Sequence, residues 1–182
     1  MDSILLAQLI YTRVSHDLSG AAGAVYNGTE LLCEDLSFAA ESAQLIQSSA
    51  DNLMKRLRFF RQTFGLQNKQ DADTTQEYLS TFSMLFTVNA PCQNNLQRCL
   101  IMTLTDVFYK GATFEVSDTY LKATGDAIKE CENLADILQK GTISQSANDA
   151  PAIFAYVLAD NLCKKLIFTK TDKSITINFK DK

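Results

Sequence analysis

The sequence predicts an α+β protein, in which an N-terminal antiparallel helical hairpin forms a dimeric four-helix bundle and a small α/β-sandwich domain follows. The hairpin is indicated by two uninterrupted heptad patterns, over residues 4–32 and 39–64, with a short break at 35–37. At the other end, apolar and polar residues alternate over 166–179 on both sides of a turn, which is typical of a β-hairpin.

The first helix is predicted over about Ser3 to Cys33, with Asp2 or Ser3 as its N-cap. Its apolar or small residues recur in alternating steps of three and four, which places them on one side of the helix. This first heptad stripe consists of Ile4, Ala7, Tyr11, Val14, Leu18, Ala21, Val25, Gly28 and Leu32.

The second helix is predicted over about Phe38 to Phe64, with Gly65 as its C-cap. Two long helices joined by a few residues lie antiparallel, and two such hairpins can close a four-helix bundle, so a homodimer is expected. The second heptad stripe consists of Ala39, Ala43, Ile46, Ala50, Leu53, Leu57, Phe60 and Phe64. The residues expected to line the shared core are Val14, Leu18, Ile46, Leu53 and Leu57.

A polar segment at 66–75 is interpreted as a linker, which divides the chain into domains at 1–65 and 76–182. The second domain is expected to be α+β. Its predicted elements, apart from the final β-hairpin, are helices at about 75–87, 91–109, 127–139 and 149–164 and strands at 113–116 and 119–123.

Composition argues against several classes of function. The net charge of −4 and pI near 5 do not suit nucleic acid or an anionic membrane. No charged leader or run of roughly 20 apolar residues is present, so a cytoplasmic location is expected. The five cysteines are scattered and the glycines after Gly65 are isolated, so neither a bound metal nor a phosphate-binding loop, and hence no cofactor, is expected.

His16 is the only histidine in the 182 residues. Relative to the first heptad stripe it occupies an f position, so its side chain is expected to point into solvent. An imidazole is largely neutral near neutral pH and can act as a nucleophile, which suits phosphoryl transfer. Hydrolysis by a nucleophile pair is less well supported, because the histidine lies on an outward helix face.

Small and polar residues follow His16 at helical spacing, namely Gly20, Gly23, Asn27 and Glu30. Glycine in a helix costs up to about 1 kcal/mol relative to alanine, so two on an exposed face suggest close approach by another protein. The alternative is that the bundle simply tolerates both glycines.

Three further features near His16 leave alternatives open. Asp17 could orient the imidazole or accept its proton, or it could be a solvated surface acid. Arg13, one turn earlier, could meet an incoming phosphoryl group or pair with a nearby acid. The cations of the second helix are interpreted as a solvated face that also steers an acidic partner; they are Lys55, Arg56, Arg58 and Arg61.

The motifs Ser15-His16-Asp17-Leu18, Ala24-Val25-Tyr26-Asn27-Gly28, Glu30-Leu31-Leu32 and Leu57-Arg58-Phe59-Phe60-Arg61 resemble the ChpT-type histidine phosphotransferases of alphaproteobacterial phosphorelays. Residues 100–116 and 158–179 are similar to units of a degenerate histidine kinase ATPase domain. Two departures from kinases stand out. Met102 and Asp106 replace the asparagines of the nucleotide-binding helix, and Ala21 replaces a frequent proline, so less kink is expected.

The resemblance implies that His16, with Asp17, carries a phosphoryl group from the receiver domain of a hybrid histidine kinase to the receiver domains of response regulators. It also implies a homodimer, with Mg²⁺ supplied by the receiver and none bound by this chain. Two rivals remain open: a non-catalytic helical-dimer adaptor with an incidental histidine, and an ATP-dependent histidine kinase, which the missing glycine-rich loops disfavour.

Overall fold

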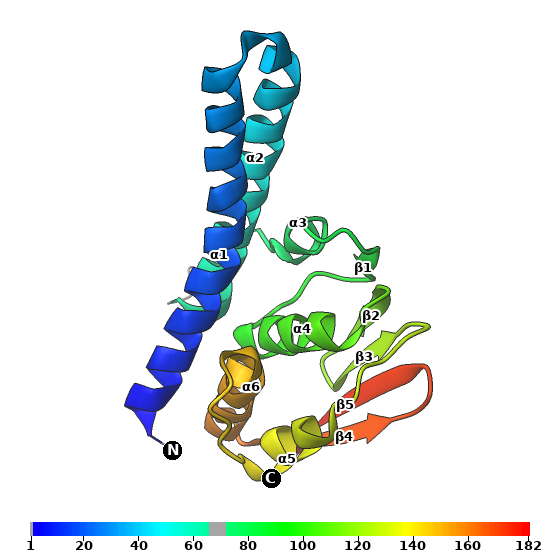
Figure 1. Cartoon of the computed structure of the whole chain (residues 1–182). Coiled ribbons are helices and arrows are strands. Elements are labelled where there is room, and N and C mark those ends of the chain that lie inside the picture. Colours follow the sequence, from blue (N-terminus) through cyan, green and yellow to red (C-terminus); the bar gives the residue numbers. More distant parts are fainter. Residues whose placement is uncertain (1, 66–71) are drawn as a thin grey trace.

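Two long antiparallel helices, α1 (Ser3–Glu34) and α2 (Ala39–Phe64), form the hairpin that extends away from the rest of the molecule (Figure 1). The structure is a computed structural model that describes residues 2–65 and 72–182. A 3₁₀ turn, η1 (Leu36–Phe38), joins the helices. The predicted hairpin is therefore confirmed, while most of the predicted linker, residues 66–71, lies outside the described residues.

The ends of α1 are set by two aspartates. The carboxylate of Asp2 accepts hydrogen bonds from the backbone N–H groups of Ile4 (2.9 Å) and Leu5 (3.4 Å), which satisfies two donors that the helix leaves unpaired. At the other end the carboxylate of Asp35 accepts from the N–H of Ser37 at 2.8 Å, which turns the chain into η1.

The second domain contains a five-stranded sheet in the order β1-β2-β3-β5-β4. β1 and β2 are parallel, and the other neighbours are antiparallel. Helices α4, α5 and α6 lie on one side of this sheet (Figure 1), which gives the expected two-layer arrangement. In chain order the elements are α3 (Thr75–Leu79), β1 (Phe86–Val88), α4 (Asn95–Val107), β2 (Ala112–Val116), β3 (Tyr120–Thr124), α5 (Glu132–Lys140), η2 (Ala147–Asp149), α6 (Ala150–Asn161), β4 (Lys164–Lys170) and β5 (Ser174–Asp181).

All four predicted helices of this domain extend beyond the observed helices at one end or both, and β-pairing accounts for two of the differences. The helix predicted over 75–87 ends at Leu79, and Phe86 begins a strand because it pairs with Ala112 of β2. The helix predicted over 127–139 begins only at residue 132, since Ile128 forms an isolated β-bridge with Phe108. Both errors arise from pairings with distant segments that local periodicity does not reveal.

The heptad stripes also differ from expectation over part of the hairpin. In the first half of α1 the buried residues are Leu6, Leu9 and Arg13, because α6 and η2 pack against that side of the helix. Ile4 and Tyr11 of the first heptad stripe are instead 69% and 74% exposed. Farther along α1, Gly28 of the first heptad stripe is buried against Ile46 of the second. In α2 the buried residues are Ser42, Ser49, Phe59, Phe60 and Thr63.

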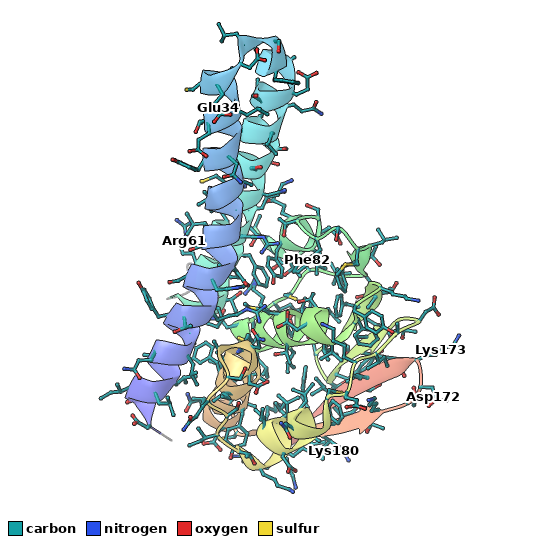
Figure 2. All side chains as sticks on the ribbon, in the orientation of Figure 1. Glu34, Arg61, Phe82, Asp172, Lys173 and Lys180 are labelled. Atoms are coloured by element: carbon teal, nitrogen blue, oxygen red, sulfur yellow. The ribbon has the colours of Figure 1, made fainter. Side chains whose placement is uncertain are left out.

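A row of aromatic rings connects the hairpin to the sheet. Phe59 of α2 stacks on Tyr78 of α3 with centroids 3.9 Å apart, and Phe82 meets Tyr78 edge-on at 5.2 Å. Phe82 then contacts Phe86 of β1, which stacks near Phe114 of β2. Figure 2 shows Phe82 between the hairpin and the sheet. These contacts, each worth about 0.5–1.5 kcal/mol beyond area burial, fix the hairpin against the second domain.

Candidate functional site

His16 projects outward from α1, and its side chain is 86% exposed. The f position expected from the sequence is thus correct. Its Nδ1 lies 3.3 Å from Oδ1 of Asp17, so Asp17 can accept a hydrogen bond when Nδ1 carries the proton. In the described part of the chain Nε2 makes no hydrogen bond, which leaves that nitrogen free to react.

Asp17 is held in place and does not act as a solvated acid. Its side chain is only 12% exposed, and its Oδ2 accepts a hydrogen bond from Nε of Arg13 at 2.9 Å. One carboxylate oxygen thus faces the histidine and the other faces the arginine. This geometry suits the orienting role that the sequence left open.

Arg13 lies inside the molecule, although the sequence placed it at the partner surface. Its guanidinium binds Asp106 of α4 through two parallel hydrogen bonds, Nη1 to Oδ2 at 2.6 Å and Nη2 to Oδ1 at 3.0 Å. Nη1 also donates to Asn148 at 3.2 Å. Burial alone would lower the pKa of Arg13, but the hydrogen bond and charge of Asp106 and the charge of Asp17 outweigh it and raise the pKa. With only 7% of its side chain exposed, Arg13 is not placed to contact a partner.

A polar cleft of about 280 Å³ lies beside His16, between α1, α2 and the turn after α3. Its cation is Arg56, whose guanidinium lies over the ring of Phe82, 5.2 Å from the ring centroid. In sequence Arg56 was only one of four basic residues, but Ser49, Asn52 and Arg56 have the spacing of one helix face, which is the signal that could have selected it. The cleft is lined by His16, Asp17, Gly20, Ala21, Ala24, Ser49, Asn52, Arg56 and Thr81.

The strip of small and polar residues beyond His16 is open. A Cβ placed on Gly20 or on Gly23 would meet no atom within 4 Å. Asn27 and Glu30 are exposed farther along α1 but do not line the cleft. Of the seven predicted site residues, the structure therefore brings His16, Asp17 and Gly20 to the cleft. It buries Arg13 and leaves the other three on the surface of α1.

An apolar groove of about 820 Å³ runs along α1, α2 and Phe154 of α6. Val14, Leu18 and Leu57 of the predicted shared core line it, and Leu57 is 46% exposed. Leu53 does not line the groove. Ile46 instead packs on Gly28, where an added Cβ would lie 2.8 Å from Ile46 Cγ1. Tyr11 and Leu57 are thus heptad-stripe residues that are exposed in a single chain and line the groove.

A second polar cavity, of about 330 Å³, lies where the resemblance to kinases would place a nucleotide, beside α4. Asp106, Glu130 and Asp149 line it, and no lysine or arginine does so among the described residues. Met102, at the other asparagine position, is completely buried. Arg13 balances the charge of Asp106, but Glu130 and Asp149 add two further carboxylates, an unfavourable surrounding for the phosphates of a nucleotide.

Within residues 2–65 and 72–182, no group of three or more His, Cys, Asp or Glu side chains is arranged to hold a metal ion.

Across the same ranges, no helix combines the length and the apolar character needed to cross a bilayer.

Comparisons with known proteins identify two that are similar to this chain. A solved structure of a bacterial phosphotransferase superposes with a TM-score of 0.80 at 22% identity, covering 99% of this chain and 98% of that chain. The predicted α+β fold, with a helical hairpin followed by a sheet domain, is thereby confirmed. Protein phosphotransferase ChpT of Brucella abortus (strain 2308) is 38% identical over 65 residues, which are 36% of this chain and 31% of that protein. Both findings agree with the resemblance drawn from the sequence motifs. No family model matches the chain.

Proposed function

We propose that the protein is a histidine phosphotransferase of a phosphorelay. In this proposal His16 takes a phosphoryl group from the aspartyl phosphate of one receiver domain and passes it to the aspartate of another. The observation that carries the proposal is an exposed imidazole that lies beside a largely buried acid and lines a cleft that also contains a cation. The names of the two similar proteins support the same class of activity.

The chemistry follows from the position of Asp17. When Nδ1 carries the proton and donates a hydrogen bond to Asp17, the lone pair of Nε2 is free and attacks phosphorus. The P–O bond to the receiver's aspartate breaks as the P–N bond forms, and the aspartate leaves as a carboxylate. The imidazole becomes cationic, and the negative charge of Asp17 stabilises it, as in other acid–histidine pairs. Transfer to the next receiver runs these steps in reverse.

Arg56 is the residue we propose to meet the negative charge of the receiver's active site. It shares the cleft with His16, whereas the charge of Arg13 is already bound by two carboxylates. Phosphoryl transfer depends mainly on positioning and on stabilising charge at the equatorial oxygens. The divalent cation expected on the receiver would share that task with Arg56. The open face at Gly20 and Gly23 allows a receiver helix to approach α1, with Asn27 and Glu30 as further polar contacts.

We also propose that two chains associate through the apolar groove. The groove exposes Met54 (48%), Leu57 (46%) and Tyr11 (74%) in a single chain. A contiguous apolar surface of this kind is unusual on a monomer and marks an interaction site. Pairing of two hairpins along it would complete the four-helix bundle that the heptad stripes predict.

The second domain, in this proposal, binds no ATP and contributes to docking. The carboxylates that line the cavity beside α4 support the first part of this proposal, that no ATP binds. Without a nucleotide the chain could not phosphorylate itself, and its phosphoryl groups would come only from receivers. A cytoplasmic location, where receivers are found, remains an expectation from the sequence.

The test is transfer of radiolabel from a panel of phosphorylated receiver domains to the wild type and to His16→Ala. Labelling of the wild type and complete loss in His16→Ala are expected, because the chain has only one histidine. Circular dichroism and light scattering on the variant confirm that its fold and mass are unchanged. Labelling that persists in His16→Ala would refute the mechanism. A wild type that binds receivers without ever becoming labelled would support the adaptor instead.

A further inference from the structure

Asp106 connects the second domain to the reactive histidine through two intermediate side chains. It lies on α4, 93 residues along the chain from Arg13, and binds both terminal nitrogens of that guanidinium. Arg13 in turn donates Nε to Asp17, and Asp17 faces Nδ1 of His16. The four side chains thus form one continuous row of hydrogen bonds from α4 to the imidazole.

The two middle side chains of the row are the least exposed. The side chains of Arg13 and Asp17 are 7% and 12% exposed, and that of Asp106 is 34% exposed. Charge-assisted hydrogen bonds of a planar guanidinium to a carboxylate are strong and directional, and they are stronger where water is excluded. While one N–H of each terminal nitrogen binds Asp106, Nε donates to one oxygen of the Asp17 carboxylate. The other oxygen of Asp17, Oδ1, faces Nδ1 of His16.

We propose that Asp106 is a positioning residue for His16: it fixes the orientation of Arg13, which fixes the carboxylate of Asp17 and so keeps the proton on Nδ1. The proposal rests on the proposed phosphotransfer function, which it deepens. It assigns a task to the aspartate at a position where the resemblance to kinases places an asparagine. On this view the second domain contributes to the geometry of the phosphoacceptor as well as to docking.

The physical consequence concerns Asp106→Asn. The amide keeps one oxygen acceptor but loses the negative charge and the second acceptor, so Arg13 is left with Asp17 as its only anionic partner. The guanidinium can then turn and bind both oxygens of Asp17. That change withdraws Oδ1 from Nδ1 and frees the imidazole to populate both tautomers and to rotate.

A direct readout exists because His16 is the only histidine. In protein labelled with ¹⁵N-histidine, the two ring nitrogens give a single set of signals whose shifts report the tautomer. For the wild type we expect mostly the tautomer with the proton on Nδ1, and for Asp106→Asn a clear shift toward a mixture. This measurement needs neither a receiver nor phosphate, so it tests the row of hydrogen bonds even if the proposed function fails.

The second readout is the rate of transfer from a phosphorylated receiver. Misplacing a reactive group by about 1 Å can cost up to about a hundredfold in rate, so Asp106→Asn should lower kcat by roughly ten- to a hundredfold. KM for the receiver should change little, because Asp106 is not on the exposed face of α1. A purely structural role for Asp106 would lower the stability of the variant without changing the tautomer or kcat below its unfolding transition.

The matched control is Asp73→Asn. Asp73 forms another buried ion pair, with Arg98 of α4 at 3.0 Å and side-chain exposures of 11% and 8%. It is not part of the row that reaches His16, so its loss should destabilise the fold while leaving the tautomer and kcat unchanged. Equal changes in both variants would show a general effect of destabilisation and overturn the proposal.

A milder variant, Arg13→Lys, covers the case in which Asp106→Asn does not fold. Lysine keeps the positive charge but cannot bind two carboxylates through a rigid fork. The same shift of tautomer and fall in kcat are expected. The proposal is refuted if the folded variants keep both the wild-type tautomer and the wild-type kcat.

Discussion

Alanine substitutions at three glycines of α1 test both the packing of the hairpin and the openness of the face next to His16. Glycine inside a helix is less favourable than alanine by about 0.5–1 kcal/mol. A Cβ at Gly20 or at Gly23 would meet no atom within 4 Å, so nothing opposes that gain. Gly20→Ala and Gly23→Ala should therefore each raise the free energy of unfolding by about 0.5–1 kcal/mol.

Gly28→Ala should behave differently. Its Cβ would lie 2.8 Å from Cγ1 of Ile46 and 3.4 Å from the backbone nitrogen of the same residue. Ile46 is β-branched and cannot easily rotate away. Forcing a methyl group into such a contact costs about 1–3 kcal/mol, so after the gain in helix propensity the net loss is between about zero and about 2.5 kcal/mol.

The assay is urea unfolding followed by circular dichroism, at one fixed protein concentration because the stability of a dimer depends on it. A Gly28→Ala variant as stabilised as Gly20→Ala would refute the close approach of the two helices. Destabilisation by Gly20→Ala would mean that another chain already covers that face. Gly23→Leu extends the series to function: we expect a higher KM for the receiver, with His16 still able to accept label at saturating receiver.

Three other predictions concern the remaining features. Leu57→Asp should give a folded monomer by light scattering, because the side chain is 46% exposed in one chain, whereas burying an unpaired carboxylate in a dimer costs several kcal/mol. An intact dimer would argue against the groove as the interface. Tyr78→Phe should leave the free energy of unfolding unchanged or raise it by up to about 2 kcal/mol, since the buried hydroxyl has no hydrogen-bond partner in the described residues. A clearly lower free energy of unfolding in urea would show that the hydroxyl has a partner. Calorimetry should detect no binding of Mg-ATP, given the carboxylates of the cavity beside α4, and micromolar affinity would contradict this.

Much of the fold could be predicted because its signals are local. The heptad periodicity of 4–32 and 39–64 gave the hairpin, and the alternation around residues 171–173 gave the pairing of β4 with β5. The strand at Phe86–Val88 was missed, because a three-residue strand has no period of its own and exists only through its pairing with β2.

In the candidate site, too, some features follow from local sequence patterns and others depend on distant contacts. The sequence by itself determined that His16 is displayed, since helical periodicity fixes which side of α1 each residue occupies. Only the tertiary structure decided that Arg13 is buried, because its partner Asp106 is 93 residues away and nothing in the local pattern of either segment indicates the other. Likewise, Arg56 was one cation among four until packing of α2 against the turn after α3 placed it in the cleft with His16. Local spacing fixes the face of a helix, whereas the long-range contacts that set charge and burial depend on how the whole chain packs.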